Sequence, residues 1–337
     1  MTSQKIQAAC QLLLQKYPTY DDFSNMMCAA GLEAPRPRNK PLVVVIEQAV
    51  RASIENGGLA ALGRVSGVAM PMFELWYLDH GPSRGRDGAL RVGFITMKCE
   101  ELDGVLARMP GHQVVDSNGR FYYRTRVGRG RRRSLDVIAL KTLTQGNLSA
   151  ASAVQTMFST WEPDYVFLCG IAGAIHKDIR IGDVAVAEQV FYYEMAKIDE
   201  GQTRSRTVAW NLSARLRAAA AIASRHSWAE STASLRPEMA PPQPKVLLCP
   251  IGSGDKLIAD SSADEIRRLR AANNKIAALE MEAAGAASAA HELGRSEQLI
   301  VVRGISDHAD AAKDDRFQRY ASDTAAAFSF ALLDFLE

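Results

Sequence analysis

The sequence has few cysteines and few histidines. Its five cysteines are an odd number and form no CxxC pair, so they indicate neither a disulfide framework nor a zinc site. The six histidines include no HExxH or other paired spacing, and we expect no metal and no organic cofactor. The cysteines are Cys10, Cys28, Cys99, Cys169 and Cys249. We interpret them as reduced thiols of a cytoplasmic protein.

Long apolar runs and an excess of one charge are also missing. No segment approaches the ~18–20 apolar residues of a membrane helix, and the N-terminus lacks the layout of a signal peptide. Because 40 Lys and Arg face 38 Asp and Glu, any binding to nucleic acid or membrane would need a local patch. The 337 residues, 47% hydrophobic, suit a globular protein of about two domains.

Hydrophobic spacing divides the chain into two parts. Residues 1–80 repeat apolar side chains at the helical period, as at Ile6, Cys10 and Leu13, and predict a small all-α domain. Residues 81–89, rich in glycine and charge, predict a linker. From residue 90 to 337, short apolar runs alternate with helical patterns.

This alternation predicts an α/β fold with a mostly parallel central sheet flanked by helices. Such sheets bind ligands at the carboxyl ends of their strands. The Ser/Ala/Pro-rich stretch 225–244 predicts a surface insertion. The expected strands are 92–96, 136–140, 165–169, 184–186, 246–249 and 299–302. The expected helices are 101–109, 150–158, 276–291 and 320–336.

Three acidic residues stand where such a sheet places its ligand. Glu101 follows one expected strand, Asp307 follows another, and Glu282 lies in the segment ALEMEAAG. Taken singly, such an acid is more often a surface charge or a helix cap, but together the three can converge on one crevice. Glu280 would point to a different face of a helix from Glu282, so we expect no catalytic role for it.

Seven sequence blocks occur in order around these acids: VGFITMKCEELDGVLARM, LTQGNLSAAS, YVFLCGIAGAI, IRIGDVAVAEQV, GSGDKLIAD, ALEMEAAGAA and VVRGISDHAD. Together they resemble the nucleoside phosphorylase/nucleosidase superfamily, in particular its methylthioadenosine/S-adenosylhomocysteine nucleosidase branch. The resemblance covers residues 91–336. The tail KDDRFQRYASDTAAAFSFALL is similar to nucleosidase-like domains fused to NLR-type immune proteins.

The resemblance implies roles for individual residues. Glu101 would activate the attacking water, Asp307 would protonate purine N7, and Glu282 would hold the ribose hydroxyls. Leu257 replaces the aromatic residue that usually frames the base in this family. The other residues implied to line the substrate site are Met281, Arg303, Ser306, Gly170, Ala172, Gly173 and Ile258.

The chemistry of the reaction needs these residue types. Cleavage of an N-glycosidic bond leaves positive charge on the sugar and negative charge on the purine. An acid at N7 neutralises the leaving base, a step typically worth ~10²–10⁴-fold, and a carboxylate beside the sugar stabilises the cation. Asp307 favours adenine as the base, and Glu101, as a base for water, favours hydrolysis over phosphorolysis.

An arginine-rich segment, YYRTRVGRGRRR at 122–133, has two open interpretations. It is either a solvated β-hairpin with Gly128 or Gly130 in its turn, or a grip on the 5′-phosphates of a nucleotide. The phosphate-binding candidates are Arg124, Arg126 and Arg129. Nucleic-acid binding is disfavoured because two adjacent tyrosines form a thin stacking platform.

Two loops offer further candidates for anion binding. His176, Lys177 and Arg180 are either a polar loop or contacts of the 5′ group. The Gly146–Asn147 turn could present backbone N–H groups to an anion.

The N-terminal part has its own resemblance. The segment LLLQKYPTYDDFSNMMCAAGLE and the later NGGLAAL resemble effector-associated, death-domain-like adaptor domains of bacterial conflict systems. This implies a protein partner with the same kind of domain, and a generic helical cap is the alternative. Relatives of the second part usually self-assemble, so we expect a homo-oligomer with no membrane partner.

Together these observations predict a purine N-ribosyl hydrolase that releases adenine from an adenine nucleoside or nucleotide, such as ATP or AMP. The resemblance of the N-terminal part to adaptor domains implies that the protein is a bacterial defence effector recruited through that part. The alternatives are a housekeeping methylthioadenosine/S-adenosylhomocysteine nucleosidase, a purine nucleoside phosphorylase and a non-catalytic nucleotide sensor.

Overall fold

The chain divides into two compact units, residues 1–83 and 84–337, in a computed structural model. The structure describes residues 88–336 with short gaps, and a few positions before them. The gaps are 118, 130–131, 177, 200–201, 212, 235, 239, 259–263 and 310–316. In the first unit, Phe23 and Ile46 have helical conformation and are buried. The rest of the expected all-α domain, and residues 81–87 of the expected linker, lie outside the described residues.

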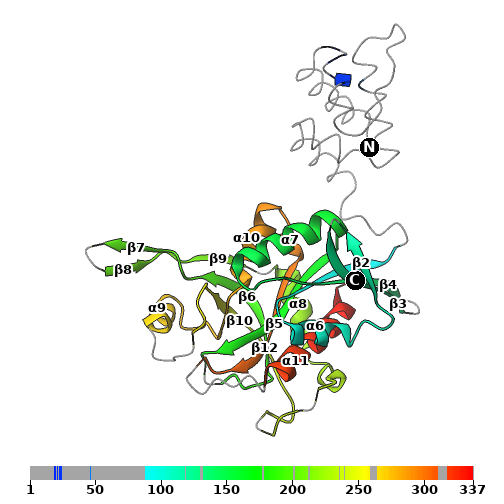
Figure 1. The fold of residues 1–337 in the computed structure, drawn as a ribbon. Coiled ribbons are helices and arrows are strands. Elements are labelled where there is room, and N and C mark those ends of the chain that lie inside the picture. Colours follow the sequence, from blue (N-terminus) through cyan, green and yellow to red (C-terminus); the bar gives the residue numbers. More distant parts are fainter. Residues whose placement is uncertain are drawn as a thin grey trace. The chain divides into compact units, whose positions relative to one another are not determined.

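A ten-stranded mixed sheet forms the centre of the described part of the second unit (Figure 1). Its strands follow the order β11-β10-β6-β12-β5-β1-β4-β3-β2, and β9 pairs with β6. The strands are β1 (Leu90–Thr96), β2 (Gln113–Ser117), β3 (Arg120–Arg129), β4 (Arg132–Lys141), β5 (Tyr165–Ala174), β6 (Val184–Tyr192), β9 (Val208–Asn211), β10 (Val246–Ser253), β11 (Ala278–Glu280) and β12 (Leu299–Asp307). A separate hairpin, β7 (Ala196–Asp199) and β8 (Gln202–Ser205), projects from this body (Figure 1).

The pairing is less parallel than the sequence pattern predicts. Strands β1, β4, β5 and β12 pair in parallel, as do β6, β10 and β11. The meander β2-β3-β4 is antiparallel, and so are the β12–β6 and β6–β9 pairs. Strand β11 also pairs antiparallel with β5. This last pairing joins the far end of the sheet back to its middle and brings the residues after β11 beside the end of β5.

Helices cover both faces of the sheet. One core lies under α7 (Asn147–Trp161) and α10 (Ala283–Glu292), which pack side by side (Figure 1). The other lies under α6 (Cys99–Leu106), α8 (Ala214–Ala223) and α11 (Gln318–Leu332). A short helix, α9 (Asp264–Ala272), contributes Ile266 and Leu269 to a smaller core. None of the helices in the described part of the chain combines the length and apolar character that crossing a membrane requires.

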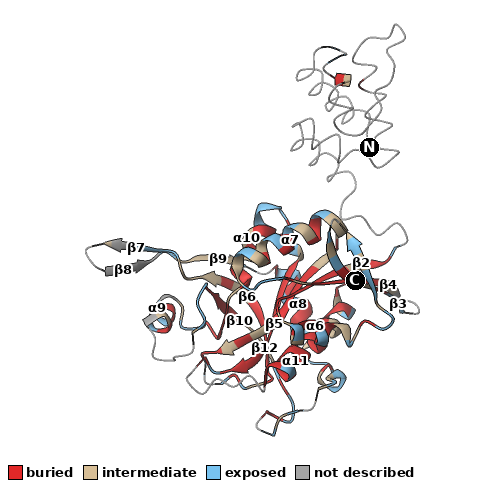
Figure 2. Cartoon of the chain, viewed as in Figure 1, coloured by how far each residue is buried: buried red, intermediate tan, exposed pale blue. Residues whose placement is uncertain are grey.

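Strand β5 shows why both faces need a cover. Val166 and Leu168 belong to the core under α7 and α10, whereas Phe167 and Cys169 belong to the core under α6, α8 and α11. Successive side chains of a strand point to opposite faces, so an unbroken apolar strand is stable only between two layers. The buried strands between partly exposed helices in Figure 2 follow this pattern.

Two expectations about local structure need correction. The alanine-rich segment 276–291 is not one helix, because it contains β11 followed by α10. The residues Ala278 and Leu279 form ladders with β5 and β10, and these contacts override the helical propensity of alanine. The stretch 225–244 is not wholly a surface insertion. Trp228 is buried, and its ring packs edge-on against Phe328 of α11.

Candidate active site

A cavity of about 550 Å³ lies where β1, β5, β11 and β12 end. The three acids singled out from the sequence, Glu101, Glu282 and Asp307, all line it. Glu101 lies about 200 residues before the other two acids along the chain, and the sheet topology brings it to them. The other lining residues are Met97, Lys98, Gln145, Ile171, Ala172, Gly173, Leu257, Leu279, Glu280, Met281, Ser306 and Gln318.

Glu101 lies in the first turn of α6, and its carboxylate is held by backbone N–H groups. Its Oε2 accepts hydrogen bonds from the N–H groups of Met97 (2.7 Å) and Lys98 (2.9 Å). Its Oε1 accepts from the N–H of Ile171 on β5 (3.0 Å). The side chain is buried at the cavity wall. These three bonds fix the carboxylate as an acceptor between two strand ends.

Glu280 and Glu282 share one buried guanidinium. Nη2 of Arg303, on β12, donates to Oε2 of Glu280 and, at 3.3 Å, to Oε2 of Glu282. Arg303 has no exposed surface. Glu280 also caps the start of α10, because its carboxylate accepts from the N–H groups of Glu282 and Ala283. The expectation that Glu280 and Glu282 point to different faces is therefore wrong, since it assumed a helix where the chain leaves a strand.

Burial raises the pKa of Glu282 to about 7. The positive charge of Arg303 acts against this rise, while the neighbouring Glu280 and Glu101 add to it. The pKa of Arg303 itself is raised, because the three glutamates outweigh the effect of its burial. This part of the cavity wall thus has more carboxylates than cations, which suits a ligand that develops positive charge.

Gly170 allows the close approach of Glu101 and Arg303. A Cβ at this position would lie 2.2 Å from Arg303 Nη1 and 2.5 Å from Glu101 Oε1. Arg303 Nη1 has no hydrogen-bond partner among the described residues. The strand β5 therefore needs glycine here, because any side chain would displace one of the two charged groups.

Asp307 is the last residue of β12 and pairs with Gly173 of β5 at the wall of the cavity. Its Oδ2 accepts from the Ser306 hydroxyl (2.8 Å), and its Oδ1 accepts from the N–H of Ala309 (2.9 Å). A Cβ on Gly173 would lie 2.7 Å from Oδ1, so glycine is needed there as well. A register shift between Ile305 and Asp307 in the pairing with β5 accompanies this arrangement. The acid is nearly buried but still reaches the cavity.

The structure places most of the other predicted substrate-site residues at this cavity. Ala172, Gly173, Met281, Ser306 and Leu257 line it. Gly170 and Arg303 do not line it, but they lie directly behind Glu101 and Glu282. Ile258 does not line it either, and it packs against the small core under α9.

The arginine-rich segment lies elsewhere. It forms the β3–β4 hairpin, as one of the two interpretations predicts, and none of its described residues lines the cavity. Arg124 makes two hydrogen bonds of 2.8 Å to the buried carboxylate of Asp136, and Arg126 lies 3.9 Å from it. Arg129 pairs with Asp334. The expected grip on a 5′-phosphate does not match this geometry, because carboxylates already occupy the guanidinium groups.

The two loops considered for anion binding behave similarly. His176 lies 3.6 Å from Asp178, and Arg180 lies 3.6 Å from Asp183, away from the cavity lining. Lys177 lies outside the described residues. The N–H of Gly146 donates to Glu282 (3.3 Å).

Asn147 links the start of α7 to β10 and α10. Its side chain binds Gly254, Asp255 and the N–H of Gly285. The Gly146–Asn147 turn therefore positions Glu282 and α10.

Sequence reasoning missed four polar or charged residues of the lining. They are Lys98, Gln145, Glu280 and Gln318. For Lys98 there was a usable signal, since it comes two residues after β1, where a strand end delivers side chains to a ligand. Gln318 is the first residue of α11, and only the packing of α11 against α6 brings it to the cavity.

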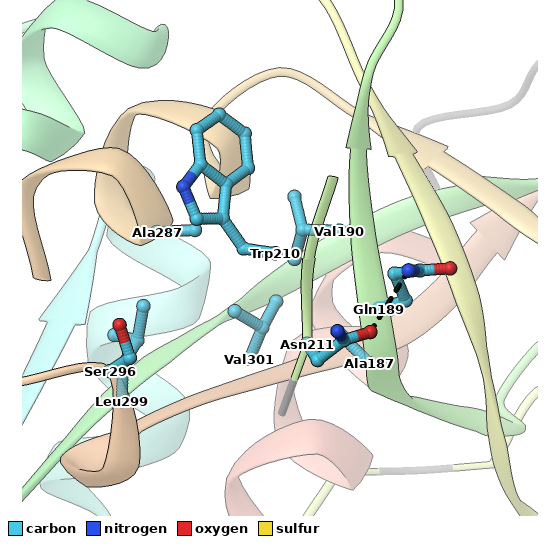
Figure 3. A pocket seen from close by; sticks show the side chains of 9 residues that line it. All are labelled: Ala187, Gln189, Val190, Trp210, Asn211, Ala287, Ser296, Leu299 and Val301. Atoms are coloured by element: carbon cyan, nitrogen blue, oxygen red, sulfur yellow. Dashed lines mark hydrogen bonds between the residues drawn. The ribbon is translucent and has the colours of Figure 1, made fainter. Parts of the chain in front are cut away.

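The hollow shown in Figure 3 offers less chemistry than the acidic cavity. It has a volume of about 30 Å³ and lies between β6, β9 and α10, and its described lining has no acidic or basic side chain. Its polar members, Gln189 and Asn211, bind each other at 2.9 Å. Within the described residues, no cluster of three or more His, Cys, Asp or Glu side chains could hold a metal ion. The acidic cavity remains the best candidate for an active site.

Comparison with known proteins finds nucleosidases among the similar sequences. ATP nucleosidase Cap17 of Escherichia coli (strain KTE188) is 28% identical over 229 residues, which are 62% of this chain and 43% of that relative. The chain thus spans less than half the length of this curated relative. The 5′-methylthioadenosine/S-adenosylhomocysteine nucleosidase of Marinomonas sp. (strain MWYL1) is 30% identical over 191 residues, 57% of this chain and 76% of that relative.

A solved structure shows the same fold. The S-adenosylhomocysteine nucleosidase of Streptococcus pyogenes superposes with a TM-score of 0.60 at 24% identity, over 74% of this chain and 98% of its own. A family model described as the phosphorylase superfamily matches residues 94–336, which include every strand that ends at the cavity except the first four residues of β1. The chain belongs to the phosphorylase superfamily.

Proposed function

We propose that this protein hydrolyses the N-glycosidic bond of adenine nucleosides or nucleotides and releases free adenine. The observation that carries the proposal is the convergence of Glu101, Glu282 and Asp307 on one cavity. The relatives named above are nucleosidases, which cleave this type of bond.

The first half of the reaction is departure of the base. Asp307 in its acid form donates a proton to N7 of adenine as the C1′–N9 bond breaks, so the base leaves as a neutral molecule. A hydroxyl can donate or accept, so Ser306 holds the carboxyl of Asp307 in either protonation state. The positive charge that remains on the ribose faces Glu282 and Glu280, whose carboxylates stabilise it.

The second half is attack by water. A water molecule in the cavity, bound to the carboxylate of Glu101, is the nucleophile. Glu101 takes a proton from this water as its oxygen bonds to C1′. The products are adenine and the free sugar. The proton from Asp307 stays on the base, and the proton from water stays on Glu101 until it exchanges.

The charges of the cavity favour water over phosphate as the nucleophile. Four carboxylates line the cavity, and the cation behind them, Arg303, is bound to Glu280 and Glu282. Beside Glu280 and Glu282, a phosphate ion would need a cation that is not bound to a carboxylate, and Lys98, the positively charged side chain of the described lining, lies at the β1 end instead. The phosphorylase alternative is therefore the less favoured one.

The relatives point to two substrate groups. The Cap17 relative is named for ATP, which supports a nucleotide substrate such as ATP or AMP and a role as defence effector recruited through residues 1–80. That role also draws on the resemblance of residues 1–80 to adaptor domains. The Marinomonas relative is named for methylthioadenosine and S-adenosylhomocysteine, which supports the housekeeping alternative.

The test is product analysis on the full chain. ATP, AMP, adenosine and methylthioadenosine are each incubated with the protein, with and without phosphate, and free adenine is measured by chromatography. We expect release without phosphate, and a loss of about 10²–10⁴-fold in Asp307→Asn. Asp178→Asn, an exposed position outside the cavity, is the matched control. Release that strictly requires phosphate, or tight binding with no release, would contradict the proposal.

A further inference from the structure

We propose that Lys98 binds a 5′-phosphate of the substrate, so that the enzyme prefers 5′-phosphorylated adenine nucleotides to uncharged nucleosides. The inference rests on the proposed function, which fixes how a nucleoside lies in the cavity. It replaces the arginine-rich hairpin, which the structure places elsewhere, as the source of phosphate recognition.

The first step is the orientation of the nucleoside. In the proposed function the base faces Asp307 at the end of β12, and the ribose hydroxyls face Glu282 after β11. Strand β5 lies between β12 and β1 in the sheet, so Lys98, two residues beyond β1, flanks the cavity on the other side of β5 from Asp307. Neighbouring strands lie about 4.8 Å apart. The ends of β12 and β1 are separated by two such spacings, which is about the length of a ribose with its 5′ substituent. The 5′ group therefore points toward β1 and Lys98.

The second step is the charge of Lys98. Among the described residues that line the cavity, it has the one positively charged side chain. Its Nζ donates to the amide oxygen of Gln318 at 2.8 Å, and no carboxylate among the described residues lies within ion-pair distance of it. An ammonium group has three donors, so this bond leaves two for a ligand. Lys98 is only half-buried, so part of its side chain is accessible to a ligand.

The third step is the field of the neighbouring helices. Lys98 is the N-cap of α6, and its partner Gln318 is the first residue of α11, so two helix N-termini meet at this contact. The N-terminus of a helix carries partial positive charge and favours anions. The first turn of α6 is occupied by Glu100 and Glu101, but the first turn of α11 has no acidic residue. The charge of Lys98 and the N-terminus of α11 thus both favour binding of an anion at this contact.

The contrast with Arg303 supports the assignment. Both cations lie near the carboxylates, but Arg303 has no exposed surface and binds Glu280 and Glu282. Lys98 is bound to a neutral amide at the cavity surface. Glu280 and Glu282 therefore make the sugar end of the cavity negative, whereas at the β1 end Lys98 places a positive charge beside Glu101. A nucleotide matches these charges, with a cationic sugar in the transition state facing Glu280 and Glu282 and an anionic 5′ end facing Lys98.

The experiment compares AMP with adenosine in four variants. We measure kcat/KM for adenine release, and the Kd of each ligand by calorimetry, in Lys98→Met, Lys98→Arg, Gln318→Glu and the control Lys275→Met, an exposed lysine outside the cavity. ATP and methylthioadenosine serve as the triphosphate and the uncharged thioether arms. Lys98→Met keeps the length of the side chain and removes its charge, and Gln318→Glu places a competing carboxylate beside the ammonium group.

We expect the wild type to prefer AMP over adenosine by about tenfold to a hundredfold, which is what a charged hydrogen bond contributes. Lys98→Met and Gln318→Glu should remove most of this ratio, whereas Lys98→Arg and Lys275→Met should keep it. An equal loss for AMP and adenosine in Lys98→Met would overturn the assignment, as would a wild type with no preference for AMP. Adenine release from adenosine alone would leave the proposed function intact while the inference fails. If no substrate is cleaved, the two Kd values still decide the inference.

Discussion

Two arginine–carboxylate clusters of opposite composition lie in this protein. The site cluster has one arginine, Arg303, close to three glutamates, Glu101, Glu280 and Glu282. The hairpin cluster has one aspartate, Asp136, close to three arginines, which are Arg91, Arg124 and Arg126. In each case the single residue of the minority charge is buried at the centre.

The difference in composition gives opposite shifts of pKa. Burial raises the pKa of Glu282 to about 7, and the charge of Arg303, which lowers this pKa, is opposed by the charges of Glu280 and Glu101. Burial would also raise the pKa of Asp136, but hydrogen bonds and charge from Arg124 and Arg91 outweigh it and lower that pKa. The site cluster thus retains a carboxylate that can exchange protons near neutral pH, whereas Asp136 stays ionised. We infer that an imbalance toward carboxylates suits chemistry and an excess of arginines suits stability.

The largest expected effect tests the chemical role of the site cluster. Glu101→Gln keeps the shape of the side chain but removes the base, and we expect adenine release to fall by about 10²–10⁴-fold. Glu100→Gln is the matched control, because Glu100 is the next residue of α6 but does not line the cavity. Steady-state rates measure both variants. A similar rate for Glu101→Gln and the control would remove Glu101 from the mechanism.

A second substitution breaks the site cluster through its backbone. In Gly170→Ala the new methyl group meets Arg303 Nη1 and Glu101 Oε1, so both must move. We expect the free energy of unfolding to fall by about 1–3 kcal/mol, and activity to fall further than this loss of folded protein explains. Gly128→Ala on β3 is the control, since nothing lies within 4 Å of its added Cβ. Denaturant unfolding combined with activity assays checks the prediction, and two variants of equal stability would contradict it.

The hairpin cluster should respond in stability rather than in catalysis. Asp136→Asn removes the charge that binds Arg124 and Arg91, and we expect about 1–3 kcal/mol less free energy of unfolding. The folded pKa lies below the usual 3.8, so this stabilisation is present above pH 3.8 and is lost as the pH falls through the folded pKa. Urea unfolding at neutral and acidic pH measures it. The kcat of the folded variant should match the wild type, and a selective loss of kcat would give the hairpin a role that we do not assign to it.

The smallest effect is the pH dependence of the site cluster. Since the pKa of Glu282 rises from 4.5 to about 7, we expect kcat/KM to increase roughly tenfold per pH unit below about pH 7 as the carboxylate ionises. The apparent value belongs to the Glu280–Glu282 pair. The sign for folding is opposite, because the folded state holds this proton more tightly, so the free energy of unfolding falls as pH rises from about 4.5 to about 7. In Glu282→Gln the acidic limb of the rate profile should move or disappear, and an unchanged limb would assign it to another group.

The fold was predictable where the sequence pattern is local. The core strands β1, β5 and β12 appear as apolar runs at 92–96, 165–169 and 299–302, and the structure extends each of them. The prediction of one helix at 276–291 was wrong, because alanine is compatible with a buried strand as well as a helix. The pairing of β11 with β5 makes the first part of the segment a strand. The edge strand β2 and the β7–β8 hairpin have no apolar run of their own, so the hydrophobic pattern of the sequence did not predict them.

For the site, residue type and the surrounding sequence motifs pointed to Glu101, Glu282 and Asp307. The structure brings all three to one cavity. The arginines of the hairpin have the right chemistry for phosphate, but their pairing with Asp136 depends on a register that no local pattern shows. The contact of Lys98 with Gln318 spans 220 residues and exists only because α6 packs against α11.

The sequence by itself pointed to an α/β domain from residue 90 onward and to the acids from which its chemistry is built, because strand periodicity and residue type are properties of short segments. Only the tertiary structure decided which charges meet. It surrounded Arg303 with glutamates and Asp136 with arginines, and it left Lys98 without a carboxylate in the described part of the chain. The reason is physical, since charge pairing depends on distances of a few ångströms between groups that the chain separates by up to two hundred residues.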